Sequence, residues 1–332
     1  MRVAVLLGGT ASERDVSITT AGQVFRALRD RGHEVMAFDT TAGRLGPEQE
    51  QALLVAQISE NEPDRATIPS RDRTMQLVMD PDGLRAADVV FLALHGGTGE
   101  NGTIQGLLDI AGIPYTGSGL LASAVAMNKN ISKQLFRTAG ILTPDWFIAD
   151  PTDAGFDSDR LGFPVVVKPS SEGSSIGLTV VKEPADFEDA VKTARGYDDE
   201  VMVEQFVPGR EFVVGVLEDQ PLAVGEIIPR STDVFDYTDK YQAGGAQKIF
   251  PADLPPDQAE EMHRLALAAH TTLKLKSYSR SDFRMDIAGN IWCLEANSLP
   301  GMTSTSLLPR SAAAVGIGFA ELCERICLDA MR

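Results

Sequence analysis

The sequence predicts an α/β protein of two or three domains, with a parallel sheet in its N-terminal part. Over roughly the first 125 residues, short apolar runs alternate with amphipathic segments of helical length, which is typical of a parallel sheet. Glycine-rich turns, GGTASE and HGGTGENG, follow two of these runs, and ligands gather at such carboxyl ends of strands. The 332 residues, 43% of them apolar, suffice for several packed cores.

The N-terminal elements follow from the periodicity of apolar residues. Strands are expected where apolar residues run together, and helices where they recur with a helical period. The expected strands are Val3–Leu7, His33–Phe38 and Asp88–Leu94, and the expected helices are Ser17–Arg31 and Thr103–Ala111. Between about Thr41 and Ala87 the chain is polar and broken by prolines, and we expect a helix near Gln49–Ile58 and a short strand near Met75–Met79.

The rest of the chain mixes helices and strands in a way that indicates α+β packing in the C-terminal part. The expected helices are Lys129–Ala139, Pro184–Ala194, Pro256–Leu273 and Ala312–Met331. The expected strands are Val165–Lys168, Leu178–Val181, Val201–Phe206, Glu211–Leu217 and Leu222–Ile228, followed by a hairpin over Ser281–Asn297.

Composition excludes several classes of protein. The net charge of −17 argues against nucleic-acid binding, which usually needs a basic face. The sequence has no apolar run long enough for a membrane span and no signal-peptide pattern, so we expect a cytoplasmic protein without membrane association. The cysteines, Cys293, Cys323 and Cys327, form no zinc pattern and are expected to be buried thiols in a reducing compartment.

The segment KPSSEGSSIG, Lys168 to Gly177, is longer than a hairpin turn between its flanking strands needs. Its small side chains leave backbone N–H groups free, and the lysine places a cation at the rim. This composition is typical of a loop that holds an anion.

The hairpin SRSDFRMDIAGNIWCLEAN predicts a metal site. Strand alternation places Phe283, Met285 and Ile287 on one face and the charged residues on the other. Cys293, Glu295 and Asn297 are expected to share a face on the second strand. Folding about Gly289 brings Glu295 and Asn297 opposite Asp282, and three such oxygen donors suit Mg²⁺.

The pattern Arg-x-Asp occurs twice in this hairpin, so two aspartates compete for the metal role. Asp286 falls beside the turn, across from Ile291 or Trp292, which is too far from Glu295. Asp282 is therefore the predicted ligand. A solvated hairpin with outward charges is the ordinary alternative, but the glycine- and serine-rich segment NSLPGMTSTSL directly after the carboxylates favours a site.

Six segments in order resemble one known family. They are GGTASERDVS, LHGGTGENGT, PYTGSG, KPSSEGSSIG, the loop around Tyr237–Tyr241, and LEANSLPGMTSTSLLP. Together they resemble the D-alanine–D-alanine ligases of the ATP-grasp superfamily, over nearly the whole chain and least between Thr41 and Ala87.

The resemblance implies a three-domain ATP-grasp fold, with an N-terminal α/β domain over 1–122 and ATP-grasp subdomains over 123–203 and 204–332. It implies that one D-alanine carboxylate attacks the γ-phosphate of ATP to give an acyl phosphate and ADP. The amine of a second D-alanine then displaces phosphate, giving D-alanyl-D-alanine for peptidoglycan synthesis. The implied cofactors are ATP as co-substrate and Mg²⁺, with Mn²⁺ as an alternative ion. Family members are often homodimers, so a homodimer is expected by resemblance alone.

The residues implied to bind the ATP phosphates match the family's lysines and loop. Lys129 and Lys168 reach the phosphates, and Lys240 touches the γ-phosphate. Ser175 lies in the segment Ser170–Gly177, which resembles the loop that folds over them.

The remaining nucleotide and metal positions are carboxylates and one amide. Glu204 resembles the glutamate that meets adenine, and Glu211 the one that meets the ribose hydroxyls. Either glutamate taken alone would more often be an exposed strand residue. Asp282, Glu295 and Asn297 match the family's magnesium ligands, in agreement with the hairpin argument.

For the first D-alanine, the resemblance implies that Glu13 pairs with the substrate ammonium and that His95 lines the site. Glu13 could also stabilise a helix N-terminus, and both roles are compatible. Ser174 and Tyr241 resemble partners of Glu13 in a hydrogen-bonded set that closes a loop over the site and excludes water. In this family a tyrosine at position 241 goes with dipeptide synthesis.

For the second D-alanine, the resemblance implies that Ser306 and Leu307 hold the carboxylate. Arg280 resembles the arginine that stabilises the tetrahedral oxyanion, and the backbone N–H of Gly301 is the expected second donor.

The chain departs from the family at a few positions. Asn128 and Asn101 stand where aspartate is common, Thr305 replaces a histidine of some members, and Ser277–Arg280 stands where glycines are frequent. These departures leave open a ligase that joins D-alanine to D-serine or D-lactate, or a nucleotide-binding relative without turnover. A dinucleotide-dependent dehydrogenase is discounted, because GGTASE lacks the Gly-x-Gly-x-x-Gly pattern.

Overall fold

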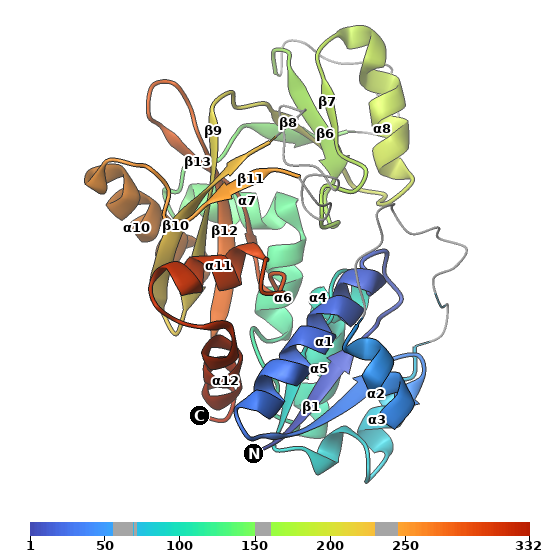
Figure 1. Ribbon diagram of the computed structural model, residues 1–332. Coiled ribbons are helices and arrows are strands. Elements are labelled where there is room, and N and C mark those ends of the chain that lie inside the picture. The colour runs from blue at the N-terminus through green and yellow to red at the C-terminus, as the bar shows by residue number, and fades with distance from the viewer. Residues whose placement is uncertain (56–68, 70–71, 150–160, 230–244) are drawn as a thin grey trace.

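The computed structural model describes residues 1–55, 69, 72–149, 161–229 and 245–332. In this part of the chain the strands form three sheets, one mainly parallel and two antiparallel (Figure 1). The mixture of a parallel N-terminal sheet with antiparallel sheets after it confirms the predicted fold class.

The N-terminal sheet has the order β3-β2-β1-β4. Its central strand, β1, pairs in parallel with both neighbours, and the helices between these strands carry the chain back to the end of the sheet where the previous strand began. The strands are β1 (Arg2–Leu7), β2 (Glu34–Asp39), β3 (Gly43–Arg44) and β4 (Val89–Leu92). The helices are α1 (Arg14–Asp30), α2 (Pro47–Leu53), α3 (Thr74–Met79), α4 (Gly97–Glu100) and α5 (Thr103–Ala111).

The central sheet is antiparallel, with the order β5-β8-β6-β7. Its strands are β5 (Trp146–Ile148), β6 (Val165–Pro169), β7 (Thr179–Val181) and β8 (Val201–Gln205). Helix α8 (Phe187–Arg195) covers one face, where Phe187, Ala190 and Ala194 pack on the valines of β6 and β8. The glycine- and serine-rich segment that follows Lys168 connects β6 to β7.

The C-terminal sheet is also antiparallel, with the order β11-β10-β9-β12-β13. Its strands are β9 (Arg210–Leu217), β10 (Gln220–Ile228), β11 (Gln247–Ile249), β12 (Tyr278–Met285) and β13 (Ile291–Asn297). Helices α6 (Leu120–Met127), α7 (Lys129–Thr138) and α10 (Pro256–Thr272) pack on this sheet. Helix α7 therefore presents its first turn to the space between the two antiparallel sheets.

The end of the chain returns to the N-terminal sheet. The structure has two helices, α11 (Leu307–Ala314) and α12 (Phe319–Asp329), so the single helix expected over Ala312–Met331 is wrong. Gly316 takes a φ of +87° between them, and this left-handed conformation ends the first helix. Helix α12 packs against α1, where Glu324 accepts hydrogen bonds from Arg31 and pairs with His33 (Figure 1).

The strand expected near Met75–Met79 is wrong, because Thr74–Met79 forms helix α3. Leu77 and Val78 are buried while Met75 and Met79 are exposed, which is the spacing of a helical turn. The Asp72 side chain accepts the backbone N–H of Thr74, two residues ahead of it. Of the helix expected near Gln49–Ile58, α2 covers the first part, and 56–58 lie outside the described residues.

The hairpin of β12 and β13 has the predicted register at its open end. Asp282 pairs with Glu295, and Arg280 pairs with Asn297. A register shift then follows, so that Phe283 pairs with Cys293. This irregularity breaks strict alternation. The predicted shared face of Cys293 and Glu295 is therefore wrong, because Cys293 packs in the core beside Phe283 while Glu295 lines a cavity.

The turn end of this hairpin differs from expectation in one further respect. Ile287 was expected to share the apolar face of Phe283 and Met285, but it is 99% exposed at the turn.

The three cysteines are buried and free, as predicted. Among the described residues, no helix has the length and apolar character needed to cross a bilayer.

Substituting Gly22 by alanine is expected to destabilise the protein. A Cβ there would lie 2.3 Å from the carbonyl oxygen of Leu53, which is backbone and cannot move aside easily. In an unobstructed helix interior the same change stabilises by about 1 kcal/mol. Here overpacking should instead lower the free energy of unfolding by about 1–3 kcal/mol. Urea unfolding measures the sign, and a stabilised variant would contradict the close packing of α1 on α2.

Candidate active site

Two adjoining cavities lie where the three sheets meet. One has a volume of about 860 Å³ and the other of about 810 Å³, both open to solvent. The first, which we name the polar cavity, is lined by the N-terminal domain and the β12–β13 hairpin. The other, the apolar cavity, lies between the two antiparallel sheets. Both are lined by Lys129, Glu172, Gly173, Ser174 and Glu295, so the two cavities share these residues as a common boundary.

The apolar cavity combines an apolar lining with two lysines. Its apolar lining comes from both sheets and consists of Val166, Ile176, Leu178, Phe206, Val207 and Leu294. Its polar lining includes Lys129, Lys168, Ser175 and Asp282. Glu204 and Glu211 also line this cavity, both with little exposure. Such a cavity can hold a flat apolar group joined to an anion.

The segment between β6 and β7 takes an unusual backbone conformation. Ser174 and Ser175 have φ values of 51° and 59°, in the left-handed region that few non-glycine residues adopt. Ser170 fixes the start of the segment, because its carbonyl accepts the backbone N–H of Lys129 at 2.9 Å. The first turn of α7 and the segment are thus held together, which places Lys129 beside it.

The carboxylates predicted to hold a metal are paired with cations. Asp282 accepts two hydrogen bonds from Arg280, at 2.6 and 2.9 Å. Glu295 lies 3.2 Å from the ammonium of Lys129. Burial lowers the pKa of Lys129, but Glu295, together with Glu100 and Glu204, outweighs burial and raises that pKa above its ordinary value. In this structure both cations are therefore held by carboxylates of the hairpin.

The oxygen donors of Asp282, Glu295 and Asn297 suit a hard cation. Asp282 and Glu295 are cross-strand partners, and Asn297 lies two residues further along β13 with its Oδ1 accepting the N–H of Leu299. Among the described residues, no group of three His, Cys, Asp or Glu side chains could hold a metal by itself. Two carboxylates with an amide oxygen match a site for Mg²⁺ that keeps water and phosphate oxygens in its other positions.

The polar cavity begins at the N-terminus of α1. Glu13 is the N-cap residue of this helix and is only 5% exposed. The hydroxyl of Ser174 donates to its carboxylate, which ties the β6–β7 segment to the N-terminal domain. Gly96 and Gly173 approach so closely that an added Cβ would lie 2.8 Å and 3.0 Å from Glu13 Oε2. Glycine at these two positions leaves the carboxylate room.

His95 lies on the floor of the polar cavity, at the end of the segment after β4. Its Nε2 is 3.2 Å from the hydroxyl of Thr20, on α1. Burial is the main cause that lowers the pKa of His95 to about 4, with Arg280 adding to it. The imidazole is therefore neutral near pH 7, and it can line a site without repelling an ammonium group.

The far wall of the polar cavity is formed by β12 and by the segment after β13. Arg280, Gly301, Ser306 and Leu307 line it. The Ser306 hydroxyl lies 2.7 Å from that of Thr303, and Ser306 is the N-cap residue of α11. A helix N-terminus offers backbone N–H groups to an anion such as a carboxylate.

The structure gathers the predicted residues at these two cavities. All of those in the described part of the chain line one cavity or the other: Glu13, His95, Lys129, Lys168, Ser174, Ser175, Glu204, Glu211, Arg280, Asp282, Glu295, Asn297, Gly301, Ser306 and Leu307. Lys240 and Tyr241 lie outside the described residues. The individual roles stay predictions.

Sequence reasoning missed two buried charged residues of this region. Glu100 lines the polar cavity at 7% exposure and accepts the N–H of Gly96 at 3.0 Å. Its signal was its place in GENG, inside a motif that we had singled out. Lys133 contacts Glu204 behind the apolar cavity, and its signal was a spacing of one helical turn from Lys129.

The Glu100 carboxyl is expected to make stability depend on pH. Burial, and after it the charge of Glu13, raise the pKa of Glu100 from 4.5 to about 8. Between these values the folded chain holds a proton that the unfolded chain has lost, so stability falls as pH rises through that window. Glu100→Gln should therefore raise the free energy of unfolding at pH 8, by roughly a few kcal/mol at most, and leave it unchanged below pH 4.5.

Urea unfolding at both pH values measures this effect. Glu188→Gln, on the exposed face of α8, serves as the control and should change stability at neither pH. An equal gain for Glu100→Gln at both pH values would contradict the elevated pKa.

Two family models and several curated proteins match this chain over most of its length. Residues 2–118 match the family model of the D-ala D-ala ligase N-terminus, and residues 135–328 match that of the C-terminus. A D-alanine–D-alanine ligase of Pelobacter propionicus is 41% identical, over 99% of this chain and 96% of the relative. One of Geobacter sulfurreducens is 40% identical, over 99% and 94%.

Solved structures agree with these sequence relatives. The crystal structure of the D-alanine–D-alanine ligase of Bacillus anthracis complexed with ATP is 31% identical, with a TM-score of 0.80. The match covers 100% of this chain and 98% of that one. A second structure of the Bacillus anthracis enzyme matches with a TM-score of 0.79 at the same identity and coverage.

Proposed function

This chain belongs to the D-alanine–D-alanine ligase family, with its ATP-grasp fold, and on that premise we propose that it joins two molecules of D-alanine into D-alanyl-D-alanine with ATP as co-substrate. The observation that carries the proposal is the pair of adjoining cavities with Lys129, Ser174 and Glu295 at their junction. A carboxylate in the polar cavity can meet a phosphate from the apolar one there, as phosphoryl transfer requires.

ATP occupies the apolar cavity in this account. The aliphatic and aromatic lining takes the adenine, with Glu204 and Glu211 beside the base and ribose. Lys129 and Lys168 bind the phosphates, and the N–H groups around Ser175 add donors from the β6–β7 segment. Because the chain carries a net charge of −17, these cations supply positive charge locally that the protein lacks as a whole.

Asp282, Glu295 and Asn297 would hold Mg²⁺, or Mn²⁺ in its place, beside the phosphates. When bound, the ion neutralises charge on the β- and γ-phosphate oxygens. The ion would then take the place of the two cations, so that Arg280 leaves Asp282 and Lys129 leaves Glu295. Arg280 thereby becomes available to substrate, and Lys129 to phosphate.

The first D-alanine binds in the polar cavity with its ammonium on Glu13. The Ser174–Glu13 hydrogen bond holds the β6–β7 segment closed over it, so that water cannot reach the acyl phosphate. His95 lines this position as a neutral group.

The second D-alanine places its carboxylate at the N-terminus of α11, on Ser306 and Leu307. Its amine then attacks the acyl phosphate carbonyl. Arg280 and the backbone N–H of Gly301 line the same cavity and stabilise the oxyanion of the tetrahedral intermediate. We further propose a cytoplasmic homodimer that supplies the dipeptide to peptidoglycan synthesis, in keeping with the family.

A substrate panel tests the proposed function. ATP-dependent phosphate release is measured with Mg²⁺ and D-alanine alone, and with D-alanine paired with L-alanine, D-serine or D-lactate, and each product is identified by mass. D-alanyl-D-alanine from D-alanine alone is the expected result. A preference for D-lactate or D-serine as second substrate would contradict it, as would ATP binding without any ligated product.

A further inference from the structure

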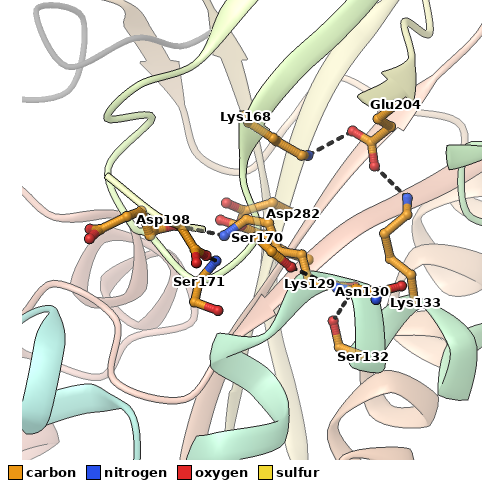
Figure 2. Close-up of polar contacts among 12 residues, drawn as sticks. Lys129, Asn130, Ser132, Lys133, Lys168, Ser170, Ser171, Asp198, Glu204 and Asp282 are labelled. Carbon is orange, nitrogen blue, oxygen red and sulfur yellow. Dashed lines mark hydrogen bonds and ion pairs between the residues drawn. The ribbon is translucent and has the colours of Figure 1, made fainter. Parts of the chain in front are cut away.

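A chain of buried charges runs behind the apolar cavity. Glu204 accepts a hydrogen bond from Lys168 at 2.7 Å on one carboxylate oxygen and a second from Lys133 on the other (Figure 2). Lys133 also donates to the hydroxyl of Thr143 at 2.7 Å. The side chain of Lys133 is 0% exposed, that of Glu204 3% and that of Lys168 10%. Lys168 and Glu204 line the cavity, whereas Lys133 lines neither cavity.

Three elements bring these charges together. Lys168 and Glu204 lie on neighbouring strands of the central sheet, and Lys133 comes from α7, one helical turn after Lys129. Trp146, the cross-strand partner of Glu204 on β5, has its ring 4.9 Å from the Lys133 ammonium. Lys133 is thus enclosed by an aromatic ring, a hydroxyl and a carboxylate, and it cannot reach a ligand itself.

Counting charges shows what Lys133 contributes. Two lysines share one carboxylate, so the three groups carry one net positive charge, which is available to an anion in the cavity. Burial raises the pKa of Glu204, but the charges of Lys133 and Lys168 outweigh it and lower that pKa below its ordinary value. Without Lys133, Lys168 would be the remaining partner of an ionised buried carboxylate. Removing one partner of a buried ion pair is costly, so Glu204 would hold Lys168 more tightly than it does when Lys133 shares its charge.

We propose that Lys133 is a positioning residue for nucleotide binding, which neutralises Glu204 and so allows Lys168 to turn from Glu204 to the phosphates of ATP. The inference rests on the proposed function in one respect, namely that ATP occupies the apolar cavity. In this role Lys133 touches no substrate, and it raises the affinity for nucleotide by acting through Glu204.

A double-mutant cycle separates this role from a merely structural one. The dissociation constant of the non-hydrolysable ATP analogue AMP-PNP with Mg²⁺ is measured by calorimetry, without D-alanine, for four proteins: wild type, Lys133→Met, Glu204→Gln and the double variant. Lys133→Met should weaken binding about tenfold relative to wild type, within the range measured for directly interacting groups. In the Glu204→Gln background the same change should have little effect, because Lys168 then has no buried carboxylate to hold it.

Two controls complete the experiment. Lys192→Met, an exposed lysine of α8, should bind the analogue as the wild type does. Lys133→Gln keeps a donor to Glu204 and Thr143 without the charge, and it replaces Lys133→Met should that variant not fold. The expected loss is the same, since the proposal depends on charge.

The outcomes distinguish this inference from the proposed function. An equal loss in both backgrounds, or no loss in Lys133→Met and Lys133→Gln, would overturn the role of Lys133 while dipeptide synthesis could still stand. Analogue binding by the wild type without dipeptide synthesis would overturn the proposed function, and the cycle would still decide the role of Lys133. Failure of the wild type to bind the analogue would overturn both.

Discussion

Asp282→Ala should lower kcat for dipeptide formation by about a thousandfold, because the carboxylate helps to hold the ion that neutralises phosphate charge, a contribution of several kcal/mol. Asp282 faces the apolar cavity and lies directly across from Glu295. A single carboxylate and the Asn297 amide would remain. The loss is measured as steady-state dipeptide formation at saturating ATP, D-alanine and Mg²⁺.

Asp286→Ala is the matched control, because the same Arg-x-Asp pattern places this aspartate in the same hairpin. Its carboxylate accepts hydrogen bonds from Ala288, Asn290 and Trp292 at the turn. Those bonds with Asn290 and Trp292 lower the pKa of Asp286 to about 2. The variant should keep near wild-type kcat while losing some thermal stability. Full activity in Asp282→Ala and none in Asp286→Ala would reverse the assignment of the ligand.

Arg280→Met should lower kcat by roughly 10²–10³-fold, the loss found on removing one oxyanion donor. In the structure the guanidinium binds Asp282, and Arg280 and Gly301 both line the polar cavity. Arg280→Lys should recover part of the activity, because it keeps the charge but not the planar pair of donors. The rate of dipeptide formation at saturating substrates measures this. A loss seen entirely in KM for ATP, with kcat intact, would contradict a role at the oxyanion.

Arg264→Met is the control, because it removes a guanidinium from the exposed face of α10 and not from the site. Arg264 pairs with Glu261 one turn earlier on the same helix, far in sequence from either cavity lining. Its removal should leave kcat unchanged. Exposed pairs of this kind contribute little to stability.

Local sequence signals predicted the register of the hairpin at the site. Gly289, in the turn, fixes which residues of the two strands face each other, so Asp282 and Glu295 could be paired from the sequence. The shift between Asp282 and Phe283 could not be foreseen, because a bulge depends on packing against neighbouring strands. Cys293 was misplaced for that reason, although its burial was correctly predicted.

Short apolar segments were the least predictable elements of the fold. Thr74–Met79 is too short for periodicity to distinguish a strand from a helical turn. In the closing segment, the apolar pattern continues through Gly316, whose left-handed φ ends α11, and the extended Gly318 then begins α12 as its N-cap residue. The long helices and the central strands, with many apolar positions each, were assigned correctly.

Residues of the site were predictable where a motif carries them. Glu100 and Lys133 escaped because their local signals, a place in GENG and a spacing of one helical turn from Lys129, do not show that their charges are buried. The importance of Glu100 arises from Glu13, on another element, and that of Lys133 from Glu204 across the central sheet. Such juxtapositions are properties of the folded chain.

The most direct test of ligation through an acyl phosphate follows the carboxylate oxygens of D-alanine into the products. D-alanine labelled with ¹⁸O in both carboxylate oxygens is incubated with ATP and Mg²⁺, and phosphate and dipeptide are analysed by mass. Attack of the carboxylate on the γ-phosphate predicts phosphate that carries one ¹⁸O, and a dipeptide that keeps one in its amide and two in its carboxylate. Dipeptide accompanied by unlabelled phosphate, or labelled D-alanine recovered without dipeptide, would contradict ligation through an acyl phosphate.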